Sequence, residues 1–351
     1  MVAPKLSLIF CCYNVSKYID GIYKWLCSQS YNNIEIIFVE DCSTDDTKKK
    51  LFSVVHDPRM KIIENSRNLG LSESRNVGLK NATGDYIGFP DPDDMFDLCW
   101  LDEIANIIKY HSPKVIITGM REDYENGENI EYSKNILSEY SGVINNNFSK
   151  VLIDLEKSFL FGYMNNKFYN REFIIKNKFS CKNLSLKEDF EFNIHVFSLI
   201  NDFYILNKPY YFYKKRRNGN TLTTKFVPDY FGIHLNSVLM LKRLLESKGN
   251  LSSDAVSLLV KRFFRYLLSA IERNTNKQAN LSFYKQKIWI KEVIEFDNNV
   301  KWFLDNCNVL NYPLKFLAIL IKMKSYNTIV FLGRFVGFVK NNLPIFFTRI
   351  K

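Results

Sequence analysis

The sequence predicts an α/β fold whose first domain has a mostly parallel central sheet, followed by an α-helical C-terminal region. Over residues 1–120, short continuous apolar runs alternate with stretches of helical spacing, and the connections between them are short. That alternation is typical of a parallel sheet with helices on both faces. From residue 228 onward the chain reads as successive helices. We therefore expect a first domain over residues 1–226 and a helical region over residues 227–351.

Four apolar runs predict buried strands, because strands covered on both faces carry apolar side chains at nearly every position. In chain order the runs are LSLIFCCYN (6–14), IEIIFVEDCS (34–43), MKIIEN (60–65) and DYIGFPD (85–91). The segments that follow them predict helices, at residues 17–30, 44–53, 72–82 and 98–110. Beyond these, residues 121–150 are polar and Asn-rich, which predicts a loop region, and PYYFYKK (209–215) predicts a further strand.

Polar side chains gather where three of these strands end. Tyr13 and Asn14 follow the first strand, Glu40 and Asp41 end the second, and residues 91–94 follow the fourth. In parallel α/β sheets, ligands bind beyond the carboxyl ends of the strands. The three clusters therefore predict one shared pocket.

The last cluster, in IGFPDPDD, holds the carboxylates of Asp91, Asp93 and Asp94. Charges crowded this closely repel one another unless a cation lies among them, and Mg²⁺ or Mn²⁺ combines one or two carboxylates with substrate phosphates. Pro92 makes the segment a turn, since proline neither extends a strand nor opens easily into a helix. The alternative is that Asp93 or Asp94 merely caps the next helix.

The ordered series IFCCYN, IEIIFVEDCSTDDT and NLGLSESRNVGLKNATGDYIGFPDPDD resembles glycosyltransferase family 2, the inverting transferases with the GT-A fold. The resemblance covers about the first 110 residues. It implies that Asp91 and Asp93 hold a divalent metal, Mn²⁺ or Mg²⁺, which bridges the diphosphate of a nucleotide sugar, with Asp93 the more direct ligand. It also implies a nucleotide half over residues 1–120 and an acceptor half over residues 121–226.

Further residues of the nucleotide side are implied by the same resemblance. The loop after the first strand matches the segment that packs along the base, and Asp41 matches a carboxylate that hydrogen-bonds the uracil or ribose. Glu40 stands where the family often has Asp, and Arg75 matches a basic residue aimed toward the nucleotide. The set of candidate nucleotide-sugar residues is Cys11, Tyr13, Asn14, Glu40, Asp41, Arg75, Asp91, Pro92, Asp93, Arg216 and Arg217. The two last belong to YFYKKRRNGNTLT, which resembles a run that closes over the diphosphate.

The acceptor side has its own candidates. Asp189 in SLKEDFEFNIHVF resembles the family's catalytic base, which removes the proton from the attacking hydroxyl, and Glu188 precedes it. The alternative is that both acids only favour the first turn of a helix through capping and the helix dipole. Lys167 and Arg171 in NNKFYNREFI resemble residues that border the acceptor or the diphosphate.

The net charge of +11 predicts an anionic partner. After Asp305 the chain has no acidic residue, and the tail over residues 308–351 mixes apolar side chains with lysine and arginine. That mixture predicts peripheral binding to an anionic inner membrane leaflet, in keeping with relatives that act on lipid-linked acceptors. Alternatively, its apolar stripe packs on the catalytic domain or on a second copy, so a homo-oligomer stays open. Seven cysteines without a CxxC pair, and no N-terminal signal peptide, favour the cytoplasm.

The resemblance to glycosyltransferase family 2 implies a metal-dependent inverting glycosyltransferase that moves a sugar, from a UDP-sugar in particular, to a glycan or lipid-linked acceptor of a bacterial capsule or lipooligosaccharide. A sugar-phosphate nucleotidyltransferase is a second interpretation, but it should have a glycine-rich loop where CCYNVSKY stands. A nucleic-acid-binding protein would explain the charge, yet no nucleic-acid motif is present and much of the excess lies in the tail. We therefore expect no nucleic-acid partner.

Overall fold

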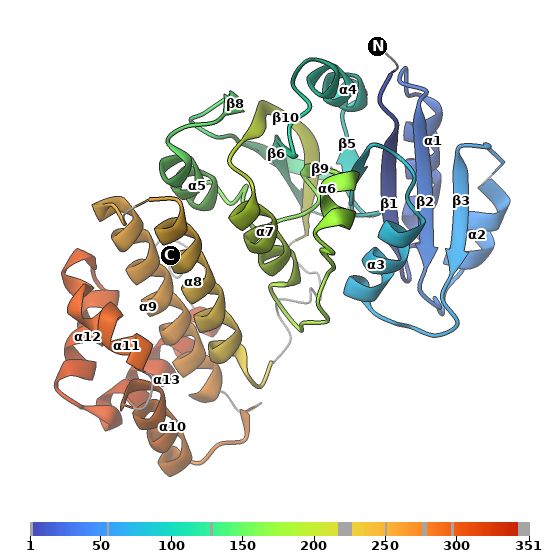
Figure 1. The fold of residues 1–351 in the computed structure, drawn as a ribbon. Coiled ribbons are helices and arrows are strands. Elements are labelled where there is room, and N and C mark those ends of the chain that lie inside the picture. The colour runs from blue at the N-terminus through green and yellow to red at the C-terminus, as the bar shows by residue number, and fades with distance from the viewer. Residues whose placement is uncertain are drawn as a thin grey trace. The chain divides into compact units, whose positions relative to one another are not determined.

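This computed structural model describes residues 3–54, 56–126, 129–216, 227–249, 251–275, 279–295 and 298–342. The chain forms two compact units, Met1–Gly219 and Asn220–Lys351. Figure 1 shows a sheet with helices in the first unit and helices alone in the second. The α/β fold with a helical C-terminal region is thereby confirmed. The boundary predicted after residue 226 lies outside the described residues.

The first half of the sheet follows the predicted strands closely. Its strands are β1 (Leu6–Cys12), β2 (Ile34–Glu40), β3 (Met60–Glu64) and β4 (Tyr86–Gly88), and the helices between them are α1 (Ser16–Cys27), α2 (Thr47–Val54) and α3 (Leu71–Asn81). All four strands run parallel, in the order β3-β2-β1-β4. Every residue of β2 is buried, as a strand covered on both faces requires.

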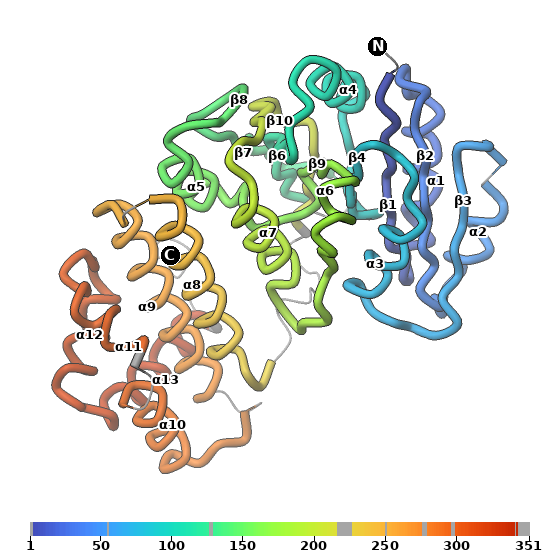
Figure 2. The backbone as a smooth tube through the Cα atoms, in the orientation of Figure 1, coloured from blue at the N-terminus to red at the C-terminus, as the bar shows by residue number. Residues whose placement is uncertain are grey.

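Alternation along β1 decides which helix covers which face of the sheet, since successive side chains point to opposite sides. Phe10 lies in contact with Phe96, which in turn contacts Trp25 of α1. Ile9 points the other way, toward Gly78 of α3. Figure 2 shows α3 alongside β1 and β2. A Cβ at Gly78 would fall 2.2 Å from Ile9 Cγ2, so α3 approaches the sheet as closely as it does only because residue 78 is glycine.

The second half of the sheet has mixed directions. Its elements are β5 (Met95–Phe96), α4 (Trp100–His111), β6 (Val115–Asn126), β7 (Asn129–Ile136), β8 (Gly142–Ile144), α5 (Phe148–Lys157), β9 (Lys167–Asn170), α6 (Arg171–Lys176), α7 (Glu188–Leu199) and β10 (Phe203–Arg216). Within the described residues the sheet has ten strands, and its order continues from β4 through β9, β6 and β10 to β5. β9 pairs antiparallel with both β4 and β6, and so joins the two halves.

The polar segment 121–150 is not the predicted loop region. It contains the second half of β6, the whole of β7, which pairs antiparallel with β6, and β8. Tyr124 and Tyr132 are partners in this pairing, and their rings stack 4.2 Å apart. Most of β7 is exposed, so its polar composition reflects solvent contact rather than the absence of a strand.

The second unit contains α8 (Tyr230–Ser247), α9 (Ser253–Thr275), α10 (Phe283–Glu295), α11 (Asn298–Asp305), the short 3₁₀ helix η3 (Cys307–Val309), α12 (Leu314–Lys322) and α13 (Tyr326–Asn342). Helix α13 approaches α9 closely, since a Cβ at Gly333 would lie 2.7 Å from Ile271 Cγ2. One face of the basic tail is therefore buried inside this unit. In the part of the chain that the structure describes, no helix is both long enough and apolar enough to cross a bilayer.

Candidate active site

The loops that follow β1 and β2 are fastened to each other at the carboxyl end of the sheet. Asn14, in the left-handed region with φ 54°, accepts a hydrogen bond at Oδ1 from Thr44 N at 2.9 Å, and its own N donates to Ser43 Oγ at 3.1 Å. Tyr13 beside it is 46% exposed, and Cys11 is half-buried. Burial raises the pKa of the Cys11 thiol to about 12, so it is neutral at physiological pH.

Glu40 and Asp41 are both buried and organise the backbone around them. Glu40 accepts hydrogen bonds from Ser43 N at 2.7 Å and from Cys42 N at 3.2 Å, which closes the turn after β2. Asp41 holds the segment that leads into α3. Its carboxylate accepts from Asn65 Nδ2, Leu69 N and Gly70 N, at 2.8, 2.8 and 2.9 Å. Its role toward a nucleotide stays a prediction.

Asp94, the third carboxylate of the acidic turn, has a structural position. It is buried, and it accepts hydrogen bonds from Tyr211 Oη at 2.6 Å and Lys214 N at 3.0 Å, both on β10. Burial, and then the charges of Asp91 and Asp93, raise its pKa well above the usual range. Asp94 therefore ties the turn to β10 and does not cap α4, whose N-cap residue is Cys99.

Asp91 and Asp93 are half-buried on either side of the buried Pro92. Burial raises the pKa of Asp91 to about 6; Arg75 opposes this shift, and the charges of Asp93 and Asp189 add to it. A carboxylate with a raised pKa beside two other acids favours a bound cation. A hard divalent ion that completes its shell with phosphate and water oxygens fits this pair. The described residues hold no group of three or more His, Cys, Asp or Glu side chains that could bind a metal unaided.

Arg75 of α3 connects this acidic turn with the start of α7. Its guanidinium forms a hydrogen-bonded ion pair with Asp189, and it lies 3.9 Å from Asp91 Oδ1 and 3.8 Å from Glu188 Oε1. Burial, and then the charge of Asp189, raise the pKa of Glu188. The structure thus brings Asp91, Arg75, Glu188 and Asp189 together from three separate parts of the chain.

A second bridge between the two carboxylates was not predicted from the sequence. Met164 N donates to Asp189 Oδ2 at 3.1 Å, and Asn165 Nδ2 donates to Asp91 Oδ2 at 2.9 Å. Adjacent residues of one segment therefore hold the candidate base and a candidate metal ligand. Only the asparagine pair before Lys167 hinted at a polar function here, and nothing in the sequence indicated its partners.

Lys167 is buried, and its ammonium holds the segment 160–166 instead of facing a substrate. Its side chain is 0% exposed, and its ammonium donates to Leu160 O at 2.7 Å, Tyr163 O at 2.5 Å and Asn166 Oδ1 at 3.0 Å. Burial lowers its pKa to about 7. Lys167 was predicted to border the acceptor or the diphosphate. That prediction is corrected, because the side chain is completely buried and has no surface for either one to contact.

Arg171 lies at the opposite end of the strands, beside the start of β4. Its Nε donates to Ala82 O, and its N donates to Asp85 O, directly before β4 begins. Since Asp91 follows the end of β4, the antiparallel pairing of β9 carries Arg171 away from the acidic turn, and its predicted place in the site is corrected as well. Arg217 lies outside the described residues, and of Arg216 only the strand backbone is described, as the last residue of β10.

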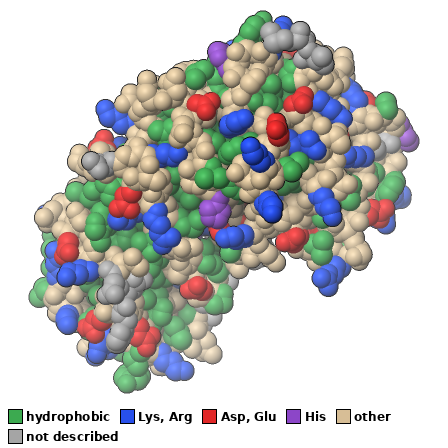
Figure 3. Space-filling model, viewed as in Figure 1, with side chains coloured by type: hydrophobic (Ala, Val, Ile, Leu, Met, Phe, Trp, Pro, Cys, Tyr) green, Lys and Arg blue, Asp and Glu red, His purple; other side chains and the backbone are tan. Residues whose placement is uncertain are grey.

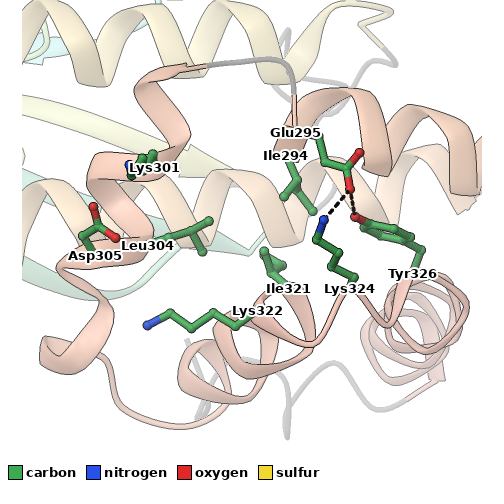
Figure 4. Close-up of a pocket in the computed structure, with 9 residues that line it drawn as sticks. All are labelled: Ile294, Glu295, Lys301, Leu304, Asp305, Ile321, Lys322, Lys324 and Tyr326. Carbon is green, nitrogen blue, oxygen red and sulfur yellow. Dashed lines mark hydrogen bonds and ion pairs between the residues drawn. The ribbon is translucent and has the colours of Figure 1, made fainter.

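On the face drawn in Figure 3, basic and acidic side chains are interspersed. A cavity of about 380 Å³ lies in the second unit, where Glu295 bonds Lys324 and Tyr326 (Figure 4). Its other lining residues are Ile294, Lys301, Leu304, Asp305, Ile321 and Lys322.

Comparison with known proteins shows what the chain is similar to. The family model described as Glycosyl transferase family 2 matches residues 7–178. The chain is similar to glycosyltransferase GlyA of Streptococcus pneumoniae serotype 4, with 30% identity over 226 residues, 62% of this chain and 32% of GlyA. It is 38% identical over 107 residues to an uncharacterized glycosyltransferase of Haemophilus influenzae, 30% of this chain and 33% of that one. The chain therefore spans about a third of the length of these curated relatives.

A cholesterol galactosyltransferase of Borreliella burgdorferi is 24% identical over 296 residues, 81% of each chain. Among solved structures, residues 1–349 of Staphylococcus aureus TarS, crystallised in complex with UDP-GlcNAc, superpose with a TM-score of 0.66 at 22% identity, covering 94% of this chain and 91% of that one. At that identity the likeness shows the fold.

Proposed function

The chain belongs to glycosyltransferase family 2 through residues 7–178, and from this premise we propose that it transfers a sugar from a nucleotide-sugar donor to an acceptor hydroxyl with inversion at the sugar carbon. The observation that carries the proposal is the arrangement around Arg75. There Asp91, one of the two carboxylates that would hold a metal, and Asp189, the carboxylate that would act as base, share one guanidinium.

The donor is proposed to be a UDP-sugar. The exposed ring of Tyr13, the half-buried Cys11, and Asn14 stand at the carboxyl end of β1, where α/β sheets bind nucleotides. Asp41 is proposed to complete this nucleotide side, and Arg216 and Arg217 to reach the diphosphate. The TarS structure with UDP-GlcNAc supports a uridine nucleotide, since that protein shares this fold.

Asp91 and Asp93 are proposed to hold Mn²⁺ or Mg²⁺. When bound, such an ion supplies positive charge to the diphosphate oxygens as the sugar leaves. The chain's own part is to present those two carboxylates, and the contacts of Asp91 fix one of them. Tyr211 Oη is hydrogen-bonded with Asp91 N at 3.1 Å, and Asn165 orients the Asp91 side chain.

Asp189 is proposed as the general base. The acceptor oxygen forms a bond to the sugar carbon while the bond from that carbon to the diphosphate oxygen breaks, and the hydroxyl proton passes to the Asp189 carboxylate. The nucleoside diphosphate leaves from the opposite face, so the configuration inverts. Glu188, 3.8 Å from Arg75 Nη1, is proposed to border the acceptor.

The acceptor is proposed to be a glycan or a lipid-linked molecule at an anionic inner leaflet, as in surface polysaccharide synthesis. Helix α13 supports a peripheral membrane contact. Phe331, Phe335 and Phe338 recur on one of its faces and are 58%, 63% and 60% exposed. No acid follows Asp305 in the sequence. Exposed aromatic side chains with cationic neighbours bind anionic interfaces. A second copy of the chain is the competing occupant of this face.

The test is nucleotide release from a panel of nucleotide sugars, measured with purified chain in the presence of Mn²⁺, Mg²⁺ or EDTA. We expect UDP from at least one UDP-sugar with metal, at least tenfold faster than with EDTA. Calorimetry should show binding of UDP with Mn²⁺ at the same site, lost in Asp91→Ala/Asp93→Ala. No UDP binding and no release from any donor would overturn the proposal.

A further inference from the structure

The guanidinium of Arg75 is positioned to serve the candidate base rather than the nucleotide. We propose that Arg75 is a positioning residue that fixes the Asp189 carboxylate for proton transfer and sets its place relative to Asp91. This inference rests on the proposed glycosyl transfer and adds a role to the same site. It differs from the role that the family resemblance implies for Arg75, which is a contact with the nucleotide.

Burial is the first argument. Arg75 is 3% exposed, and its guanidinium is surrounded by acids of this chain. Nη1 bonds Asp189 and lies 3.8 Å from Glu188, while Nη2 faces Asp91 at 3.9 Å. Burying a cation is unfavourable unless it is paired, and here the pairing is intramolecular. Little surface of the side chain remains for a diphosphate to contact.

The second argument is how firmly the guanidinium is placed. Arg75 stands in the second turn of α3, which begins at Leu71. Just before that helix, the Leu69 and Gly70 amides are held by the Asp41 carboxylate at 2.8 and 2.9 Å. Gly78, one turn beyond Arg75, sits directly on Ile9 of β1. The helix is thereby fixed both at its start and on the sheet, so Arg75 has a defined position from which to hold another group.

The third argument is the geometry of the base itself. Asp189 Oδ1 accepts a hydrogen bond from Arg75, and Asp189 Oδ2 accepts one from Met164 N. The two donors come from segments that are distant from each other in the sequence. A carboxylate held at both oxygens cannot rotate freely, and each oxygen keeps a lone pair to accept the hydroxyl proton. Because Asn165 holds Asp91, and Arg75 also faces Asp91, the two carboxylates behave as one rigid unit. Catalysis requires the reacting groups to be placed within a fraction of an ångström.

The test separates positioning from nucleotide binding. Arg75→Gln and Arg75→Lys are compared with wild type for kcat, for KM of a UDP-sugar that supports turnover, and for the Kd of UDP with Mn²⁺. We expect kcat to fall at least 30-fold in Arg75→Gln, with the Kd of UDP changed by less than threefold. Arg75→Lys keeps the charge and recovers part of the loss. In an Asp189→Asn background, Arg75→Gln should lower the residual rate by less than threefold, because groups that act as a unit are not additive.

The matched control is Arg59→Gln, which removes another partly buried guanidinium–carboxylate pair of the first unit, with Asp57, outside the site. The kcat of Arg59→Gln should equal that of wild type. If Arg75→Gln does not fold, Arg75→Lys carries the comparison, and its kcat must still fall with UDP affinity kept. A tenfold weaker UDP affinity with kcat retained would overturn the inference in favour of a nucleotide contact, and additive losses with Asp189→Asn would also overturn it. A wild type that binds UDP but never transfers sugar would instead overturn the proposed function.

Discussion

Arg75 on α3 and Asp189 at the start of α7 stand 114 positions apart in the sequence and form an ion pair inside the first unit. Asp91 faces the same guanidinium at 3.9 Å. The two carboxylates are proposed for opposite sides of the site, Asp91 toward the donor and Asp189 toward the acceptor. One buried cation contacts both of them.

Asp93→Ala is expected to abolish metal-dependent UDP release and to weaken metal-dependent UDP binding, because the half-buried Asp93 is proposed as a direct ligand. A loss of one carboxylate ligand should weaken Mn²⁺-dependent UDP affinity at least tenfold, as measured by calorimetry. The fold should persist, with an unchanged far-UV spectrum. Asp20→Ala, an exposed acid on α1, is the control and should behave as wild type. Unaltered turnover of Asp93→Ala in excess Mn²⁺ would remove this residue from the metal site.

Asp94→Ala is expected to act on stability instead. The change leaves Tyr211 Oη and Lys214 N without their buried acceptor, and an unpaired buried donor costs about 1–3 kcal/mol. Urea unfolding of the variant should show that loss in the free energy of unfolding. A variant as stable as wild type would mean that Asp94 does not hold the turn to β10.

Glu35 should make the first unit sensitive to acid. Burial by itself would raise its pKa, but hydrogen bonds from Ser7 Oγ and from the N and Oγ1 of Thr83, together with the charge of Lys61, outweigh burial and lower it to about 2. A folded pKa below the unfolded value of about 4.3 stabilises the fold above that value, and the contribution is lost as the pH falls toward 2.

The size of that contribution is about 3 kcal/mol, from the pKa difference between the folded and unfolded states. Urea midpoints at pH 6, 4 and 3 should therefore fall more steeply for wild type than for Glu35→Gln. The exposed Glu139→Gln serves as control and should follow wild type. Parallel curves for wild type and Glu35→Gln would contradict the prediction.

The membrane proposal is best tested by surface substitution. Truncation near Leu310 would also remove Leu317, Ile321, Ile329 and Val330, which are buried inside the second unit. Changing Phe331, Phe335 and Phe338 to Ser leaves that core in place. We expect at least tenfold less protein to float with phosphatidylglycerol vesicles. Phe52→Ser, at an exposed phenylalanine of α2, should float as wild type does. Unchanged flotation of the triple variant, or loss of a dimer in its place, would contradict the proposal.

Much of the first half of the fold could be predicted from sequence, because the buried strands of a parallel sheet have continuous apolar runs. Strands β1 to β3 fall inside the predicted runs, and the acidic turn follows β4 as expected. Strands β6 and β7 could not be found in this way. The second half of β6, residues 121–126, is polar and β7 is mostly exposed, so neither carries a continuous apolar run, although β6 itself lies inside the sheet between β9 and β10.

The candidate site shows the same division. The resemblance proposed Asp91, Asp93 and Asp189 as site residues, but the partners that hold them lie up to 114 positions away in the sequence. Lys167 illustrates the limit. A lysine beside asparagines suggests a surface cation. Here the side chain is completely buried, and its ammonium donates to oxygens of Leu160, Tyr163 and Asn166. Spacing along the chain carries no information about such partners.

The position of β9 between β4 and β6 has a consequence for engineering acceptor preference. A chimera that joins the first 120 residues of this chain to the remainder of a relative would insert a foreign strand into the centre of the sheet, next to Gly88 and Ile116. Exchanges that keep residues 160–170 with their native neighbours, and graft segments beyond them, are the recombinants with the best prospect of folding.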